Sequence, residues 1–319
     1  MSLSKVPPQK GVLHTYGFNL TAFEFTGYSG EIETEAAANI LLFIGGLGNG
    51  LLNVPYLPAL AEAASTRFHA NGGGKWSLVQ VLLGSAYSGW GTASLERDSS
   101  QLAKAIEYFR SYAGGRRKKI VVMGHSTGCQ NSLHYLSTVV ARLESSSKAQ
   151  IEGAILQAPV SDQEALRASY TGGGDFEQLT QEVYDEYIAT GRDRELLPEK
   201  YRKIAFNVPI TAYRFYSLAA KRGDDDFFSS YLTQEDLKET FGKVSKPLLL
   251  LYSGSDQFVP AHVDKQQVFE NFEKATPASY WSKYSRIIPG GTHDLGEGSE
   301  KDVILLLTEA VANFINAEV

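Results

Sequence analysis

The chain has 319 residues, of which 43% are hydrophobic and 21% are charged, and its net charge at pH 7 is −6. This balance is typical of a globular protein with one large core and excludes a disordered chain. The acidic balance argues against a nucleic-acid-binding surface. The single cysteine, Cys129, excludes an intrachain disulfide and fits a reducing compartment.

Short apolar runs alternate with helical patterns along the chain, which is typical of βαβ units around a parallel sheet. We expect strands at residues 11–16, 20–26, 39–44, 76–83, 119–123, 151–156, 247–252 and 284–288. We expect helices at residues 54–68, 96–112, 127–143 and 301–314. The pattern therefore predicts a mostly parallel eight-stranded sheet with flanking helices.

Residues 161–246 interrupt this alternation, because they are polar, helical in pattern and rich in tyrosine. We interpret them as a helical cap inserted into a core made of residues 1–160 and 247–319. The insertion leaves and re-enters at strand ends, where open α/β sheets bind ligands. The alternative is a long excursion with no role in binding. Within it, Asp224-Asp225-Asp226 is expected to be a solvated loop.

The strongest chemical signal is the segment Gly124-His125-Ser126-Thr127-Gly128, which follows an apolar strand and opens a helical pattern. This is the context of a G-x-S-x-G nucleophile elbow, in which glycines permit a sharp turn that exposes the serine. A serine nucleophile needs a base, and the base needs an orienting carboxylate. The backbone N–H of Thr127 is expected to help bind the oxyanion.

In such folds the three groups follow the order serine, acid, histidine. His293 lies in the loop after the last expected strand and is our choice for the base, with His262 as its rival. Asp256 follows the penultimate strand and is our choice for the acid. Asp162, one strand earlier, is the alternative, because some triads on this fold take the acid from that position.

Other residues near the strand ends are candidates for binding. In the loop Gly45–Gly50, the Leu47 N–H is our first choice for a second oxyanion donor, and Gly46 is next. Tyr87 and Trp90 follow the fourth strand and either line the substrate cleft or pack the loop onto the domain. Cys129 is expected to be a packed core residue.

These motifs resemble the α/β-hydrolase superfamily over nearly the whole chain. Four stretches are similar to the fungal siderophore-esterase (fusarinine C esterase) family, at residues 44–58, 88–98, 123–130 and 156–162. This resemblance implies hydrolysis of the ester bonds that join hydroxamate units in fusarinine-type siderophores, with release of iron inside the cell. The chain departs from many esterases at Gly45-Gly46, where those enzymes have His-Gly, which leaves the second oxyanion donor open.

Two other functions stay open at this point: a carboxylesterase or lipase-like hydrolase of other small esters, and a non-catalytic ligand-binding protein with the same fold. No motif indicates a cofactor, a bound metal or a macromolecular partner, and the sequence does not determine the oligomeric state. The first ten residues contain no apolar stretch typical of a signal peptide, and no window approaches the ~18 apolar residues of a membrane span. We therefore expect a cytoplasmic protein without membrane contact.

Overall fold

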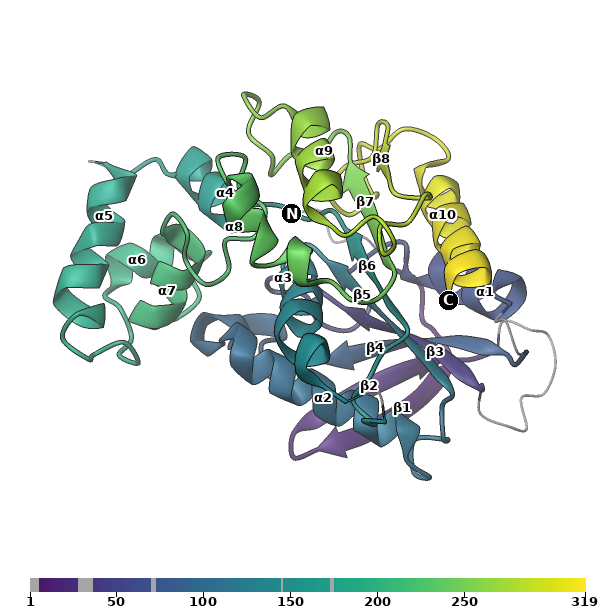
Figure 1. Cartoon of the computed structure of the whole chain (residues 1–319). Helices are drawn as coiled ribbons and strands as arrows, with labels where there is room; N and C mark the ends of the chain where they lie inside the picture. Colours follow the sequence, from purple (N-terminus) through teal and green to yellow (C-terminus); the bar gives the residue numbers. More distant parts are fainter. Residues whose placement is uncertain (1–5, 28–36, 70–72, 145, 173–174) are drawn as a thin grey trace.

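The structure is a computed structural model that describes residues 6–27, 37–69, 73–144, 146–172 and 175–319. Within these ranges eight strands form one sheet in the order β1-β2-β4-β3-β5-β6-β7-β8 (Figure 1). The pairs β1–β2 and β2–β4 are antiparallel, and the other neighbours are parallel. The predicted mostly parallel eight-stranded sheet is thus confirmed. The strands are β1 Gly11–Gly17, β2 Leu20–Phe25, β3 Asn39–Ile44, β4 Trp76–Leu82, β5 Lys119–His125, β6 Gly153–Gln157, β7 Leu248–Ser253 and β8 Arg286–Ile288.

The helices include every one that the sequence predicted, with small differences at their ends. In the described ranges they are α1 Leu57–Arg67, α2 Leu95–Arg110, α3 Gly128–His134, α4 Asp162–Ser169, α5 Phe176–Val183, α6 Glu199–Ile204, α7 Ala212–Ala219, α8 Gln234–Lys238, α9 Lys265–Ala275 and α10 Val303–Glu318. The predicted helix at 127–143 continues from α3 through a π-helical turn, Tyr135–Val139, and a 3₁₀ turn, Val140–Arg142. Among the described residues no helix has the length and apolar character needed to cross a bilayer.

Side chains of the central strands alternate between two apolar clusters on opposite faces of the sheet. In β3, Ile40, Leu42 and Ile44 belong to the cluster that includes side chains of α2, α3 and α9. Leu41 and Phe43 belong to the other cluster, with side chains of α1 and α10. This arrangement explains why β3 is a continuous apolar run, because helices cover both faces of a parallel sheet.

Helices α4 to α7 have an apolar cluster of their own, and α5, α6 and α7 stand to one side of the sheet (Figure 1). Trp90, from the 3₁₀ segment Tyr87–Thr92, joins that cluster from the core. Further along the insertion, Phe228 and Phe241 pack instead with the sheet cluster that contains α2 and α3. The division of the chain at residues 161 and 246 stays a prediction.

The expectation of a solvated loop at Asp224-Asp225-Asp226 is wrong for Asp225, which is only 2% exposed. Its Oδ2 atom lies 2.6 Å from Nη1 of Arg214, which is on α7 and is also buried. A buried guanidinium is costly to desolvate unless a carboxylate faces it. Burial of Arg214 therefore accounts for burial of its acidic partner.

Candidate active site

The elbow is built from a strand end, one strained residue and two glycines. Ser126 has φ 56°, in the left-handed region that non-glycine residues rarely adopt and that is often found at active sites. A Cβ atom on Gly124 would lie 2.0 Å from the carbonyl oxygen of Gly128, and one on Gly128 would lie 2.4 Å from that of Ile44. Only glycine at these two positions lets α3 pack this closely against β5 and β3.

The loop after β3 borders the serine directly. A Cβ atom on Gly46 would lie 2.6 Å from Cβ and 3.0 Å from Oγ of Ser126. The Gly46 N–H already donates to Oδ1 of Asn49 at 2.8 Å. The N–H groups of Leu47 and Thr127 have no acceptor among the described residues. Leu47, rather than Gly46, therefore offers a free donor to pair with Thr127.

The proposed acid and base are in contact. Nδ1 of His293, in the loop after β8, lies 2.7 Å from Oδ2 of Asp256, in the loop after β7, and both residues are buried. The other carboxylate oxygen of Asp256 accepts from the Phe258 N–H at 2.9 Å. The His293 N–H donates to Oε1 of Gln257 at 3.0 Å. The loop 256–258 thus fixes both partners, which is what an orienting carboxylate requires.

The two alternatives from the sequence lie elsewhere. Oδ2 of Asp162, at the start of α4, accepts from Nε2 of Gln130 at 2.7 Å. Burial and the neighbouring Asp225 raise the pKa of Asp162 to about 8. His262 is exposed and lines a separate cavity. Within the described ranges, the carboxylate that bonds to the His293 ring is that of Asp256.

A second imidazole, that of His125 in the elbow, lies beside the proposed base. Its ring centroid is 4.9 Å from that of His293. Burial, followed by the charge of His293, lowers the pKa of His125 to about 3, so this ring is neutral at neutral pH. Among the described residues the Ser126 hydroxyl makes no hydrogen bond to His293. Such bonds are often long without substrate and tighten in the complex.

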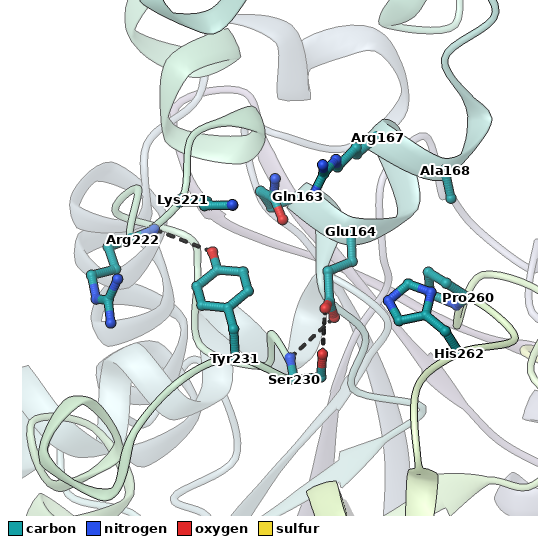
Figure 2. Close-up of a pocket in the computed structure, with 10 residues that line it drawn as sticks. All are labelled: Gln163, Glu164, Arg167, Ala168, Lys221, Arg222, Ser230, Tyr231, Pro260 and His262. Atoms are coloured by element: carbon teal, nitrogen blue, oxygen red, sulfur yellow. Dashed lines mark hydrogen bonds between the residues drawn. The ribbon is translucent and has the colours of Figure 1, made fainter. Parts of the chain in front are cut away.

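A cavity of about 770 Å³ lies between α4 and the loop that follows β7 (Figure 2). Several of its lining residues carry a charge, among them Arg167, Lys221 and Arg222. Glu164 points toward Ser230 and accepts from the Ser230 N–H at 3.1 Å (Figure 2). A cavity of this size falls in the range of small-molecule sites. The loop after β7, which contains Asp256, contributes Pro260 and His262 to its lining.

The two aromatic candidates have different surroundings. Tyr87 is 52% exposed, and its hydroxyl accepts from the Leu51 N–H at 3.1 Å, which links it to the glycine-rich loop. Trp90 is buried and shares a narrow apolar hollow of about 10 Å³ with Leu47 and side chains of the insertion. Both aromatic residues therefore lie beside the glycine-rich loop, Tyr87 at Asn49 and Gly50 and Trp90 at Leu47.

The remaining sequence expectations concern Cys129 and metal ligands. Cys129 is buried, and its thiol donates to carbonyl oxygens of Gly124 and Gln157 at 3.3 and 3.1 Å. Burial raises the pKa of this thiol, so it is a packed core residue, as expected. In the part of the chain that the structure describes, no group of three or more histidine, cysteine, aspartate or glutamate side chains is arranged to hold a metal ion.

Comparison with known proteins identifies the family. A family profile described as "Protein of unknown function (DUF1749)" matches residues 1–316. The chain belongs to the DUF1749 family. The DUF1749 chain is 35% identical to fusarinine C esterase sidJ of Aspergillus fumigatus, over 96% of both sequences. The resemblance to the fungal siderophore-esterase family is therefore confirmed.

Solved structures agree with this assignment. The siderophore hydrolase EstB from Aspergillus fumigatus matches the DUF1749 chain with a TM-score of 0.78 and 33% identity, over 98% of each chain. An α/β-hydrolase-fold protein of unknown function matches with a TM-score of 0.64 and 18% identity, over 96% of this chain and 97% of that one. The DUF1749 chain thus has the predicted α/β-hydrolase fold.

Proposed function

We propose that this protein is a serine esterase that hydrolyses the ester bonds of fusarinine-type hydroxamate siderophores and so releases iron inside the cell. The observation that carries the reaction type is the 2.7 Å hydrogen bond between His293 and Asp256, next to the strained elbow at Ser126. The substrate class is supported by the siderophore esterase and hydrolase named among its relatives.

The reaction follows from the donor and acceptor roles of the three side chains. Because Asp256 accepts a hydrogen bond from Nδ1 of His293, the proton of the neutral ring is on Nδ1 and Nε2 has a free lone pair. Nε2 removes the Ser126 proton as Oγ attacks the ester carbonyl, and then gives it to the departing alcohol oxygen. Water enters by the reverse sequence, which releases the acid and restores the serine. Iron arrives bound to the substrate.

Charge that develops on the carbonyl oxygen needs donors in place before the reaction. The unpaired N–H groups of Leu47 and Thr127 are the proposed donors, and loss of one such donor typically reduces kcat by about 10²–10³-fold. The low pKa of His125 also helps, because a neutral ring does not repel the imidazolium that forms on His293.

The apolar hollow beside the proposed oxyanion loop argues against a lipid substrate. The apolar hollow beside Leu47 has a volume of only about 10 Å³, which leaves no space for an acyl chain. The cavity of about 770 Å³ is separate from this hollow, and Ser126, Asp256 and His293 are not among the residues that line it. Hydrolysis of other small esters remains the second candidate.

A substitution at the nucleophile tests the reaction. Ser126→Ala should abolish turnover of ferric and iron-free fusarinine C and triacetylfusarinine C, as followed by mass analysis of the fragments. Ser137→Ala is a matched control, because its buried hydroxyl donates to the carbonyl oxygen of Leu133 within the helix. An unchanged rate in Ser126→Ala would exclude the proposal.

Two further measurements separate the alternatives. Faster turnover of short p-nitrophenyl esters than of every siderophore ester would favour a general carboxylesterase. Failure of a fluorophosphonate probe to label Ser126 in the folded protein would favour a non-catalytic binding protein. The proposal expects labelling at Ser126 and a preference for the siderophore ester.

A further inference from the structure

Gln157, the last residue of β6, is fully buried and has no assigned part in the reaction described above. A buried amide with two donors and two acceptor sites must find partners for all of them. Besides the strand ladder, four hydrogen bonds to its side chain and two to its carbonyl oxygen meet at this residue. Apart from Tyr56, which precedes α1, their partners come from the segments that contain Ser126, Asp256 and His293.

On the side of the elbow, Gln157 contacts the residues around the serine. Its carbonyl oxygen accepts from the Ser126 N–H at 3.1 Å and from the Cys129 thiol at 3.1 Å. Its side-chain Oε1 accepts from Nδ1 of His125 at 2.6 Å and from the Tyr56 hydroxyl at 2.8 Å. The strained backbone at Ser126 is therefore held through its own N–H and through the side chain of the preceding residue, His125.

On the other side, the same amide reaches the acid and the base. Nε2 of Gln157 donates to the carbonyl oxygen of His293 at 3.3 Å and to Oγ of Ser253 at 3.2 Å. Ser253 ends β7, and its carbonyl oxygen accepts from the N–H of Asp256 at 3.3 Å. One side chain thus joins the two loops whose contact forms the His293–Asp256 pair.

These partners also determine which way the amide faces. The carbonyl oxygen of His293 can only accept, so the NH₂ group of Gln157 must point to it. Oε1 then faces His125, whose Nδ1 must carry the proton of the neutral ring. Tyr56 must donate for the same reason. The network has one consistent arrangement of protons, with every hydrogen-bonding site of the Gln157 amide in use.

Resting on the proposed function, we propose that Gln157 is a positioning residue. Its hydrogen bonds hold the Ser126 elbow, the end of β7 before Asp256 and the loop that contains His293 at the relative positions that the reaction needs. The reaction depends on atoms from three segments far apart in the sequence, and a displacement of about 1 Å can cost on the order of 10²-fold in rate. A fully satisfied amide between the segments limits such displacements.

Two variants of Gln157 test this inference. Gln157→Leu removes all four side-chain hydrogen bonds and should lower kcat by about 10–10²-fold, with KM within about twofold of the wild-type value. Gln157→Glu retains acceptors for His125 and Tyr56 but loses the donor to His293. An ionised carboxylate in place of the amide would favour the imidazolium on His293, so the acidic limb of the kcat/KM profile should move to higher pH.

Control variants distinguish positioning from simple support of the fold. Gln150→Leu removes a buried glutamine three residues before β6, whose amide donates to carbonyl oxygens of Leu143 and Glu144. It should lower the melting temperature without lowering kcat per folded molecule. Tyr56→Phe deletes a single hydroxyl, so it keeps the test available even if Gln157→Leu does not fold, and it should lower kcat by a smaller factor.

A spectroscopic readout separates this inference from the proposed function. The short hydrogen bond between His293 and Asp256 should give a far-downfield proton resonance that is shifted or lost in Gln157→Leu, whether or not the protein is an esterase. Failure of the fluorophosphonate probe to label Ser126 in the wild type would contradict only the proposed function. If both Gln157 variants kept the kcat, the pH profile and the proton resonance of the wild type, the positioning role would be overturned.

Discussion

The buried ring of His125 predicts a specific loss of stability in mild acid. Burial lowers its pKa from 6.5 to about 3, and its Nδ1–H is bonded to Gln157. Well above about pH 6.5 the ring is neutral in both the folded and the unfolded chain, so its full contribution to stability is present. Below that pH the unfolded chain binds a proton that the folded protein does not bind, and stability falls as the pH falls.

The magnitude follows from the two pKa values. Between about pH 7.5 and about pH 5, this ring alone should reduce the free energy of unfolding by about 2 kcal/mol. His125→Asn removes the titrating group and keeps a neutral donor close to the position of Nδ1. Urea unfolding of both proteins at several pH values gives the free energy of unfolding at each pH. The wild-type curve should fall by about 2 kcal/mol more than that of His125→Asn over this interval.

A matched control removes an exposed histidine. His262→Asn deletes one imidazole that contacts solvent and lies outside the core. Its unfolding free energy should show the same pH dependence as the wild type. Parallel wild-type and His125→Asn curves would refute the reasoning, because they would mean that the buried ring takes up protons as readily in the folded state as in the unfolded state.

Two further predictions concern close packing and buried charge. Gly46→Ala should lower kcat by on the order of 10²-fold with a nearly unchanged melting temperature, because the added Cβ would lie 2.6 Å from Cβ of Ser126. A wild-type kcat in this variant would contradict the prediction. Arg214→Met should reduce the free energy of unfolding by about 3–5 kcal/mol, because it leaves the buried Asp225 carboxylate without its cationic partner. Adding Asp225→Asn should recover part of this loss. Equal stabilities of the single and double variants in urea would argue against the buried pair.

Elements with a strong local signal were predictable from the sequence. β3 was predicted with the observed bounds, because five consecutive apolar residues follow Asn39 and end at a pair of glycines. The ends of β6 and β8 differ by one or two residues, since hydrogen bonding to neighbouring strands decides where a strand begins. α9 was not predicted, although Asp264 caps it and Val268, Phe269, Phe272 and Ala275 recur at helical spacing. The polar residues of its exposed face weakened that signal.

Some features of the candidate site were likewise predictable from the sequence, and others were not. The order of serine, acid and histidine led to Asp256 and His293, whose contact the structure contains. Two features of the site could not be predicted from the sequence, because they depend on the folded conformation. The Gly46 N–H is occupied by Asn49, which only the folded loop reveals. Gln157 is a glutamine at a strand end, a position that sequence alone assigns to the solvated surface, and its partners are spread from Tyr56 to His293.

The position of α10 has a consequence for synthesis of the chain. Its side chains, among them Leu307, Val311 and Phe314, complete the apolar cluster on one face of the central strands. The ribosome makes these residues after β3, β5 and β6. Until they emerge, the nascent polypeptide exposes apolar strand surface, which favours aggregation. Protection by a chaperone during translation should therefore raise the yield of active enzyme more than later treatment of the released chain.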